Sequence, residues 1–452
     1  MRDMTSGSVP RLMLWFTVPL LLTNLLQQLY SMVGSILVGR LVGKDALAAV
    51  GTAGSVFNVL MFIVIGLSMG ASVLFAEFYG SKAYELLKRE FSTALLCGLG
   101  FTVCLSAAAF ALAGPILRLV NTPESLIPDA RTYLRITIAG LCFTLLFNIL
   151  ASALRSVGNA KVPLVVLALS SAVNIGLTFV LVRPMGVAGA ALATVIAQAL
   201  AALLCLIYIQ IKVPVLTLKP RDLTIDFSLL RRTVSYSSVA AVQQSVLYVG
   251  YLLVQGAVNT LGVDAMAAYN AVSKIDGFAL MPGIALGDAV STFVAQNRGA
   301  DKPERIRAGL KIGVAMGLIY CAGLAVIMLI FARSFMLWFL LPQETAAIAA
   351  GLSYLRVMAF LYSMTAVCNA FQGFFRGLGK MGVTLNATLV QIPIRVVLAY
   401  MMVGRMGLNA LTLAMGSGWV CMIAYEILEY NRYSHGTFLV RRRKRRKGQG
   451  HS

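Results

Sequence analysis

Long hydrophobic segments, separated by short polar or turn-forming stretches, make up most of the chain. A bilayer core about 30 Å thick needs about 20 apolar residues in a helix. Segments of this length lie at about 12–39, 46–78, 92–113, 131–153, 162–182, 187–211, 232–260, 265–295, 308–332, 348–375, 383–404 and 407–430. Prolines, glycines and charges mark the breaks between them. The pattern therefore predicts an all-α integral membrane protein with twelve transmembrane helices.

The composition supports the membrane class. The chain is 59% hydrophobic and 12% charged, whereas a soluble domain carries about 25% charged residues. The net charge of +21 is spread between apolar segments, so we expect no nucleic-acid partner. The exception is RRRKRRK at 441–447. We expect this tail to be solvated, and it suits anionic lipid headgroups, at about 1 kcal/mol per basic residue.

Lysine and arginine set the expected orientation. They gather at the N-terminus, in alternate connecting segments and in the tail, and such segments stay on the cytoplasmic side. Both termini are then cytoplasmic, in agreement with an even number of helices. The prediction is a multi-pass protein of the inner or plasma membrane.

The second half of the chain repeats the first. QQLYSMVGSILV at 27–38 recurs as QQSVLYVGYLLV at 243–254. Further along, Thr144, Asn148, Arg155, Gly158, Met185, Gly186 and Ala193 recur at one constant offset as Thr365, Asn369, Arg376, Gly379, Met406, Gly407 and Ala414. Because six helices are an even number, both copies enter from one side, and a pseudo-two-fold axis runs along the membrane normal, as in secondary transporters.

The repeat divides the chain into four predicted parts. These are an N-terminal six-helix lobe at 1–211, a cytoplasmic linker at 212–231, a C-terminal six-helix lobe at 232–431 and a basic cytoplasmic tail at 432–452. Substrate would bind between the lobes, near mid-membrane.

Several motifs resemble the multidrug and toxic compound extrusion (MATE) family. They are VGR at 38–40 with DALAAVG at 45–51, ALRSVGNAKVP at 153–163, Asn174, MGVAGAALAT at 185–194 and AQNRGA at 295–300. The resemblance covers about residues 12–430. It implies a twelve-helix, two-lobed antiporter that expels organic, often cationic, compounds in exchange for H⁺ or Na⁺.

Polar residues within the spans are the candidate lining of a substrate cavity, since they need partners or water in lipid. The candidates are Gln27, Tyr30, Gly34, Asn148, Asn174, Thr178, Gln243, Gln244, Tyr248, Tyr362, Thr365, Asn369 and Arg395. Aromatic faces among them suit bulky cations. The alternatives are hydrogen bonding within each lobe and, around Gly34 and Gly250, close helix packing. Arg155 and Arg376 are expected to anchor the cytoplasmic edge.

Two acids are the candidates for ion coupling. Asp276 and Asp288 lie inside the eighth segment, about 18 Å apart along the axis and about 120° around it, so they cannot form one pair. Asp276 is the stronger candidate, and an ion pair with Arg395 is its structural alternative. Glu77 is expected to be structural.

The chain departs from the family at the usual acids of the first half. Many relatives carry Asp where this chain has Gly34 and again where it has Thr178. Acids of other subgroups align approximately with Gln243 and Thr365. The resemblance therefore leaves Asp276 and Asp288 as the coupling candidates.

We predict an antiporter and no enzyme. Both histidines, His435 and His451, lie near the C-terminus, and the cysteines show no metal-binding spacing, so no cofactor or metal is expected. The expected partners are a small-molecule substrate, H⁺ or Na⁺ and membrane lipids, and the protein is expected to be a monomer. A flippase for a lipid-linked precursor, from the same superfamily, is the alternative; it would have a basic central cavity.

Overall fold

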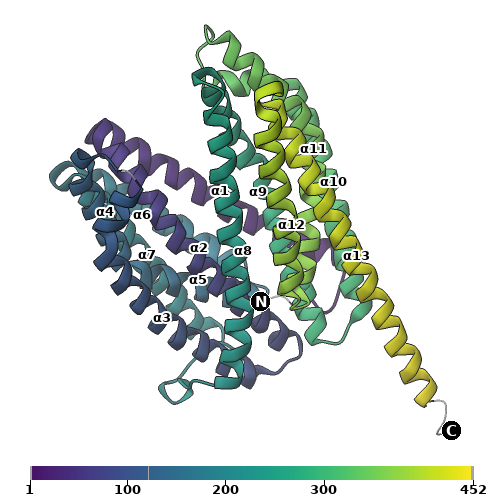
Figure 1. Ribbon diagram of the computed structural model, residues 1–452. Helices are drawn as coiled ribbons and strands as arrows, with labels where there is room; N and C mark the ends of the chain where they lie inside the picture. The colour runs from purple at the N-terminus through teal and green to yellow at the C-terminus, as the bar shows by residue number, and fades with distance from the viewer. Residues whose placement is uncertain (1–2, 121, 449–452) are drawn as a thin grey trace. The chain divides into compact units, whose positions relative to one another are not determined.

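The computed structural model describes residues 3–120 and 122–448, with side chains to residue 435. The side chains of the tail at 441–447 thus lie outside the described residues. The elements are α1 (Val9–Leu41), α2 (Lys44–Gly80), α3 (Tyr84–Leu119), η1 (Glu124–Leu126), α4 (Ile127–Ala139), α5 (Leu141–Ser156), α6 (Lys161–Met185), α7 (Val187–Lys212), η2 (Pro220–Asp222), α8 (Phe227–Asn259), α9 (Val263–Gly299), α10 (Pro303–Leu337), α11 (Thr345–Gly377), α12 (Met381–Met406) and α13 (Asn409–Gly448) (Figure 1). The described part of the chain has no β-strand.

The predicted spans are confirmed. Among the described residues, 11 helices are long and apolar enough to cross a membrane. A further span is Glu124–Ala139 followed by Leu141–Ser156, which bend by 44° where they meet. This bent pair covers the predicted span at 131–153 and brings the number to 12. The all-α membrane fold predicted from the hydrophobic pattern is therefore present.

The two halves also share the backbone conformation at equivalent helix ends. Gly186 ends α6 and Gly407 ends α12, both with φ of 56°. Each glycine donates its N–H to a valine carbonyl of the last turn, at 2.8 Å to Val182 and 3.0 Å to Val403. Positive φ strains residues with a Cβ, and a glycine just past the last turn is a common helix stop. The same stop signal thus works at both repeat-related positions.

The residues divide into two compact units, each with its own core. The first comprises Met1–Ser245, Ile284–Gly313 and Arg376–Gly379, and the second comprises Val246–Gly283, Val314–Phe375 and Lys380–Ser452. In the first unit α6 packs on α1 and α7, and in the second α12 packs on α13. The predicted lobe boundaries, which follow the repeat, stay a prediction.

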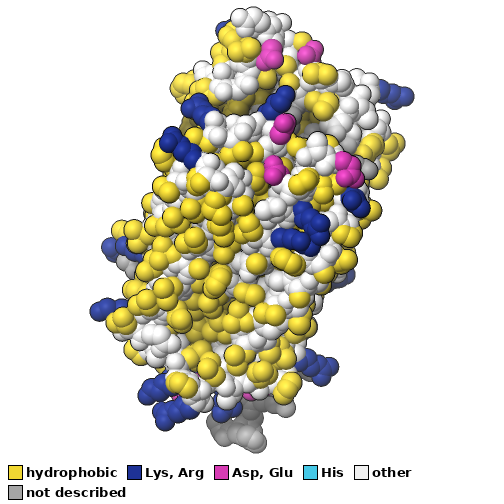
Figure 2. All heavy atoms as spheres, turned by 90° about the vertical axis from the view of Figure 1, so that its left-hand side faces the viewer, with side chains coloured by type: hydrophobic (Ala, Val, Ile, Leu, Met, Phe, Trp, Pro, Cys, Tyr) yellow, Lys and Arg dark blue, Asp and Glu magenta, His cyan; other side chains and the backbone are white. Residues whose placement is uncertain are grey.

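Apolar side chains cover much of the surface. Phe360, Met401 and Ile330 are each about two-thirds exposed, at 65%, 71% and 66%. Hydrophobic side chains also dominate the face in Figure 2. Soluble proteins rarely expose continuous apolar areas of this kind, so this surface requires lipid around it.

Residues 3–7, here called the N-terminal strap, lie against the end of α9 and the start of α10. The Met4 N–H donates to Gln296 Oε1 at 3.0 Å, and Asn297 donates to the Met4 carbonyl at 3.1 Å. Lys302 donates to another strap carbonyl at 2.8 Å, and Arg305 to three more strap carbonyl contacts at 2.8–3.3 Å. The start of the first repeat is therefore fastened to helices of the second.

Candidate functional site

A buried carboxyl group with two tyrosine partners lies in the second unit. Asp276 of α9 is 8% exposed, and Tyr354 and Tyr362 of α11 are 0% exposed. The Tyr354 hydroxyl donates to Asp276 Oδ2 at 2.8 Å, and the Tyr362 hydroxyl donates to Oδ1. The two tyrosines are about two turns apart on α11. Helix α11 thus supplies a hydrogen bond to each of the two carboxyl oxygens of Asp276.

This environment suits a carboxyl group that gains and loses a positive ion. An ionised acid inside a membrane protein is costly without partners, and hydrogen bonds to a charged acceptor are worth about 1.5–3 kcal/mol each. Two phenol groups support the carboxylate without neutralising it permanently.

The alternative pair between Asp276 and Arg395 does not form. Among the described residues, no ion pair within 4 Å joins them. Arg395 Nε is buried and has no hydrogen-bond partner. Instead, Tyr354 and Tyr362 each donate to one carboxyl oxygen, which sequence reasoning did not predict. Tyr362 was predicted to line a cavity, and Tyr354 was not singled out.

Asp288 differs from Asp276 in exposure and in partner. Arg376 Nη1 lies 3.3 Å from Asp288 Oδ1, and the Asp288 side chain is 46% exposed. The same nitrogen lies 3.3 Å from the sulfur of Met69. An exposed acid with a permanent cation partner is a poor ion-coupling group, so the geometry favours Asp276.

Thr365 and Asn369 of α11, and Asn148 at the repeat-related position of α5, bond along their own helices. Asn369 Nδ2 donates to the Thr365 carbonyl at 2.9 Å, and Asn148 Nδ2 donates to the Thr144 carbonyl at 2.8 Å. The Thr365 hydroxyl likewise donates to a carbonyl one turn back, at 2.8 Å. These bonds run within single helices, so they are not the bonds between helices that the structural alternative expects.

A polar cluster without a carboxyl group lies in the first unit. Thr178 donates to Asn174 at 3.5 Å within α6, and Asn174 donates to Thr194 of α7 at 3.4 Å. Tyr30 of α1 hydrogen-bonds to Thr194 as well. Asn174, Thr178 and Tyr30 were predicted, and Thr194, part of the MGVAGAALAT motif, was not.

The glycines of the repeated segment have different surroundings. A Cβ on Gly34 would meet no atom within 4 Å, whereas one on Gly250 would lie 2.6 Å from Ile392. The packing alternative therefore holds for Gly250 and fails for Gly34. A side chain at position 34 would therefore meet open space.

The other candidate residues vary in burial. Gln27 is exposed, Gln243 is buried, and Gln244 and Tyr248 are half-buried. Their role in a substrate cavity stays a prediction.

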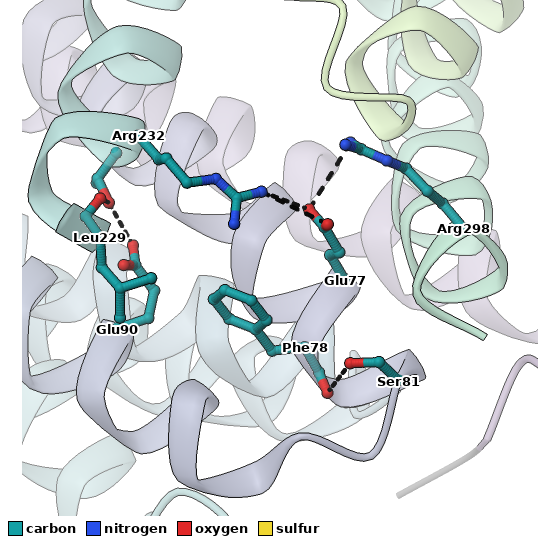
Figure 3. A network of polar contacts seen from close by, with 8 residues as sticks. Glu77, Phe78, Ser81, Glu90, Leu229, Arg232 and Arg298 are labelled. Carbon is teal, nitrogen blue, oxygen red and sulfur yellow. Dashed lines mark hydrogen bonds and ion pairs between the residues drawn. The ribbon is translucent and has the colours of Figure 1, made fainter. Parts of the chain in front are cut away.

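A network of ion pairs links α2, α8 and α9 within the first unit (Figure 3). Glu77 Oε2 lies 3.2 Å from Arg232 Nη2 and 3.7 Å from Arg298 Nη1. Beside it, Glu90 is fully buried, and its Oε1 lies 2.5 Å from the Thr233 hydroxyl. The contacts agree with a structural role for Glu77. Glu90 was missed, since nothing in the sequence distinguishes it from an exposed acid near a helix start.

Two glycines let α2 and α9 cross closely beside this network. A Cβ on Gly80 would lie 2.0 Å from the Gln296 carbonyl oxygen, and one on Gly299 would lie 2.0 Å from the Glu77 carbonyl oxygen. Gly80 and Gly299 are repeat-related, and Glu77 and Gln296 are related by the same offset along the chain. The crossing therefore has the symmetry of the repeat.

These features define a class of protein, a multi-pass membrane transporter built from a duplicated helical unit. The MatE family model matches residues 19–180 and again residues 240–401. The chain therefore belongs to the multidrug and toxic compound extrusion family. The two matches also support the duplication that the sequence predicts.

Individual relatives agree with this assignment. The chain is 33% identical over 365 residues to the probable multidrug resistance protein YoeA of Bacillus subtilis, with 78% of each chain covered. It is 28% identical over 390 residues to the probable multidrug resistance protein YpnP of the same organism, covering 86% of this chain and 87% of that one. A solved outward-facing multidrug resistance MATE transporter has a TM-score of 0.89 at 20% identity, with 96% of this chain and 98% of that chain covered. This last likeness concerns the fold.

Proposed function

We propose that this protein is a secondary antiporter that exports organic, cationic or amphipathic compounds in exchange for H⁺ or Na⁺, with Asp276 as the coupling group. The names of the two Bacillus subtilis relatives support the substrate class. The observation that carries the proposal is the buried Asp276 carboxyl group, held by two tyrosine hydroxyls and, among the described residues, with no ion pair within 4 Å.

The coupling rests on competition for one buried negative charge. When Asp276 is ionised, a cationic substrate gains from its field, which little solvent screens inside the protein. When H⁺ or Na⁺ occupies the carboxyl group, that gain is lost and the substrate leaves more easily. A gradient of the small ion then drives export, because binding of the two ligands is linked.

The test is ethidium transport by purified protein in liposomes, driven in turn by an imposed pH gradient and an imposed Na⁺ gradient. We expect Asp276→Asn to abolish transport driven by either gradient, because the amide keeps the side-chain shape and removes the titratable charge. The gradient that drives the unsubstituted protein identifies the coupling ion.

Asp264→Asn is the matched control, since Asp264 is an exposed acid in the first turn of the same helix α9. It should transport ethidium as the unsubstituted protein does. If Asp276→Asn retains gradient-driven transport at the control's rate, Asp276 is not the coupling group.

A second candidate function rests on Arg395. Its buried Nε without a hydrogen-bond partner is the kind of group that an anionic cargo would engage, as in a flippase for a lipid-linked precursor. This function requires Arg395→Gln to abolish movement of a fluorescent lipid-pyrophosphate across liposomes, with ethidium transport absent throughout. Ethidium transport by the unsubstituted protein would refute it.

A further inference from the structure

A second acid of the C-terminal half is fully buried. Glu426 of α13 is 0% exposed. Its Oε1 accepts a hydrogen bond from Gln372 Nε2 of α11 at 2.6 Å, and its Oε2 is buried without a hydrogen-bond partner. Among the described residues, no ion pair includes it. It was not singled out from the sequence.

The chemistry of this site favours a neutral acid. Burying an ionised carboxylate without a partner cation costs several kcal/mol even after relaxation, whereas a protonated carboxyl group carries only the cost of a neutral polar group. A single hydrogen bond from the Gln372 amide, with Oε2 left without a partner, does not compensate a full negative charge. The geometry therefore points to a Glu426 that holds a proton in this conformation.

The groups around Glu426 do not supply a cation. Cys368 on α11, a thiol without positive charge, is close enough to interact electrostatically with Glu426. Lys380, before the start of α12, lies 5.2 Å above the ring of Tyr433, two turns beyond Glu426 on α13. Arg376, one turn beyond Gln372, is paired with Asp288. Lys380 and Arg376 thus have other partners.

Helix α11 links this acid to the proposed coupling group. Tyr362 bonds to Asp276, and Gln372 bonds to Glu426. The two α11 residues are ten positions apart, about 15 Å along the helix. Gln372 lies nearer the end of α11, which the charge pattern predicts to be cytoplasmic. Glu426 is thus placed between Asp276 and the predicted cytoplasmic side.

We propose that Glu426 is a second proton-carrying group of this antiporter, with Gln372 as its positioning residue; the proposal rests on the proposed function and adds a proton site to it. Gln372 Nε2 donates to Oε1 in both states, since this atom is a carboxylate oxygen when Glu426 is ionised and the carbonyl oxygen when Glu426 is protonated, so the pair suits both states. Glu426 takes the proton from water when α11 and α13 rearrange and returns it to water, and no other bond changes.

Infrared difference spectroscopy on the full-length protein in lipid tests the protonation directly. We expect a band of a protonated carboxyl group that decreases as the pH is raised and is missing in Glu426→Gln. Glu429→Gln is the control, because Glu429 is on the same helix and pairs with Arg432 at 2.5 Å. A full band in Glu426→Gln overturns the proposal.

Gln372→Leu covers the case in which Glu426→Gln does not fold. Loss of the 2.6 Å hydrogen bond should shift the Glu426 band to higher frequency in the folded protein. A band at the same frequency in Gln372→Leu contradicts the assignment.

Transport then separates this proposal from the proposed function. With two proton sites, Glu426→Gln should lower the number of protons moved per ethidium by about half, since one of two linked titrations is removed. If Asp276→Asn abolishes coupling and Glu426→Gln leaves the proton count unchanged, the proposed function stands and this inference fails. If Glu426→Gln lowers the count while Asp276→Asn changes nothing, the inference stands and Asp276 is the wrong coupling group.

Discussion

The crossing of α2 and α9 offers a sharp test of the structure through Gly80→Ala. The added Cβ would lie 2.0 Å from the backbone oxygen of Gln296. A carbonyl oxygen cannot rotate away as a flexible side chain does. The two helices must therefore separate, or the last turn of α2 must distort.

The size of the effect follows from two opposing contributions. Alanine is intrinsically favoured over glycine within a helix by about 0.5–1 kcal/mol, and overpacking of a close contact costs about 1–3 kcal/mol, occasionally more. Helix separation also lengthens the ion pairs of Glu77 with Arg232 and Arg298, at 3.2 and 3.7 Å. We expect a net loss of about 1–2 kcal/mol in the free energy of unfolding, since the overpacking cost exceeds the helix preference.

Thermal unfolding in detergent, followed by tryptophan fluorescence, measures this loss. Gly51→Ala is the matched control on the same helix, because its Cβ would meet no atom within 4 Å. It should leave the midpoint unchanged or raise it slightly. Gly299→Ala should act like Gly80→Ala, and the double variant should lose less than the sum, since both act on one contact. A Gly80→Ala midpoint equal to that of Gly51→Ala would refute the close crossing.

Further predictions concern the N-terminal strap and the start of α8. Arg305→Ala removes the donor to three strap carbonyl contacts, so a soluble protease should cleave residues 3–7 faster. Arg307→Ala, on the same helix, should leave the cleavage rate unchanged. Equal cleavage of the two variants would contradict the contacts. The Leu229 and Ser228 backbone N–H groups hold the pKa of Asp226 below its ordinary value. The side chain of Asp226 thus caps the start of α8 by accepting hydrogen bonds from these two N–H groups. This cap is complete above the ordinary aspartate pKa, and it is lost as the pH falls through the lowered pKa of Asp226. Hydrogen exchange, corrected for its intrinsic pH dependence, should lose protection at these two N–H groups over that acidic range; protection that is unchanged by pH or by Asp226→Ala would refute the cap.

The parts of the fold that follow from local signals were predictable from the sequence. Apolar length predicts the spans, and matched glycines such as Gly186 and Gly407 end helices in the same way in both halves. These features need only neighbouring residues, so one sequence suffices.

The site was only partly predictable, because burial depends on residues far apart in the chain. Asp276 was found because it interrupts a long apolar segment. Its partner Tyr354 and the buried acids Glu90 and Glu426 were missed. Both glutamates lie where an exposed interfacial charge is equally reasonable, and only packing against Thr233 or Gln372 distinguishes them.

Comparison of repeat-related positions shows where the two halves differ in buried charge. At the offset that relates Gly80 to Gly299, the counterpart of Asp276 is Phe57. At the offset of the later repeat positions, the counterpart of Tyr354 is Tyr133. Phe57 and Tyr133 pack against one apolar cluster of α2, α3 and α4. The same place in the fold is therefore an apolar contact in the first half and an acid–tyrosine site in the second. Together with the open space beside Gly34, this difference supports the proposal that an acid of the second half is the coupling group.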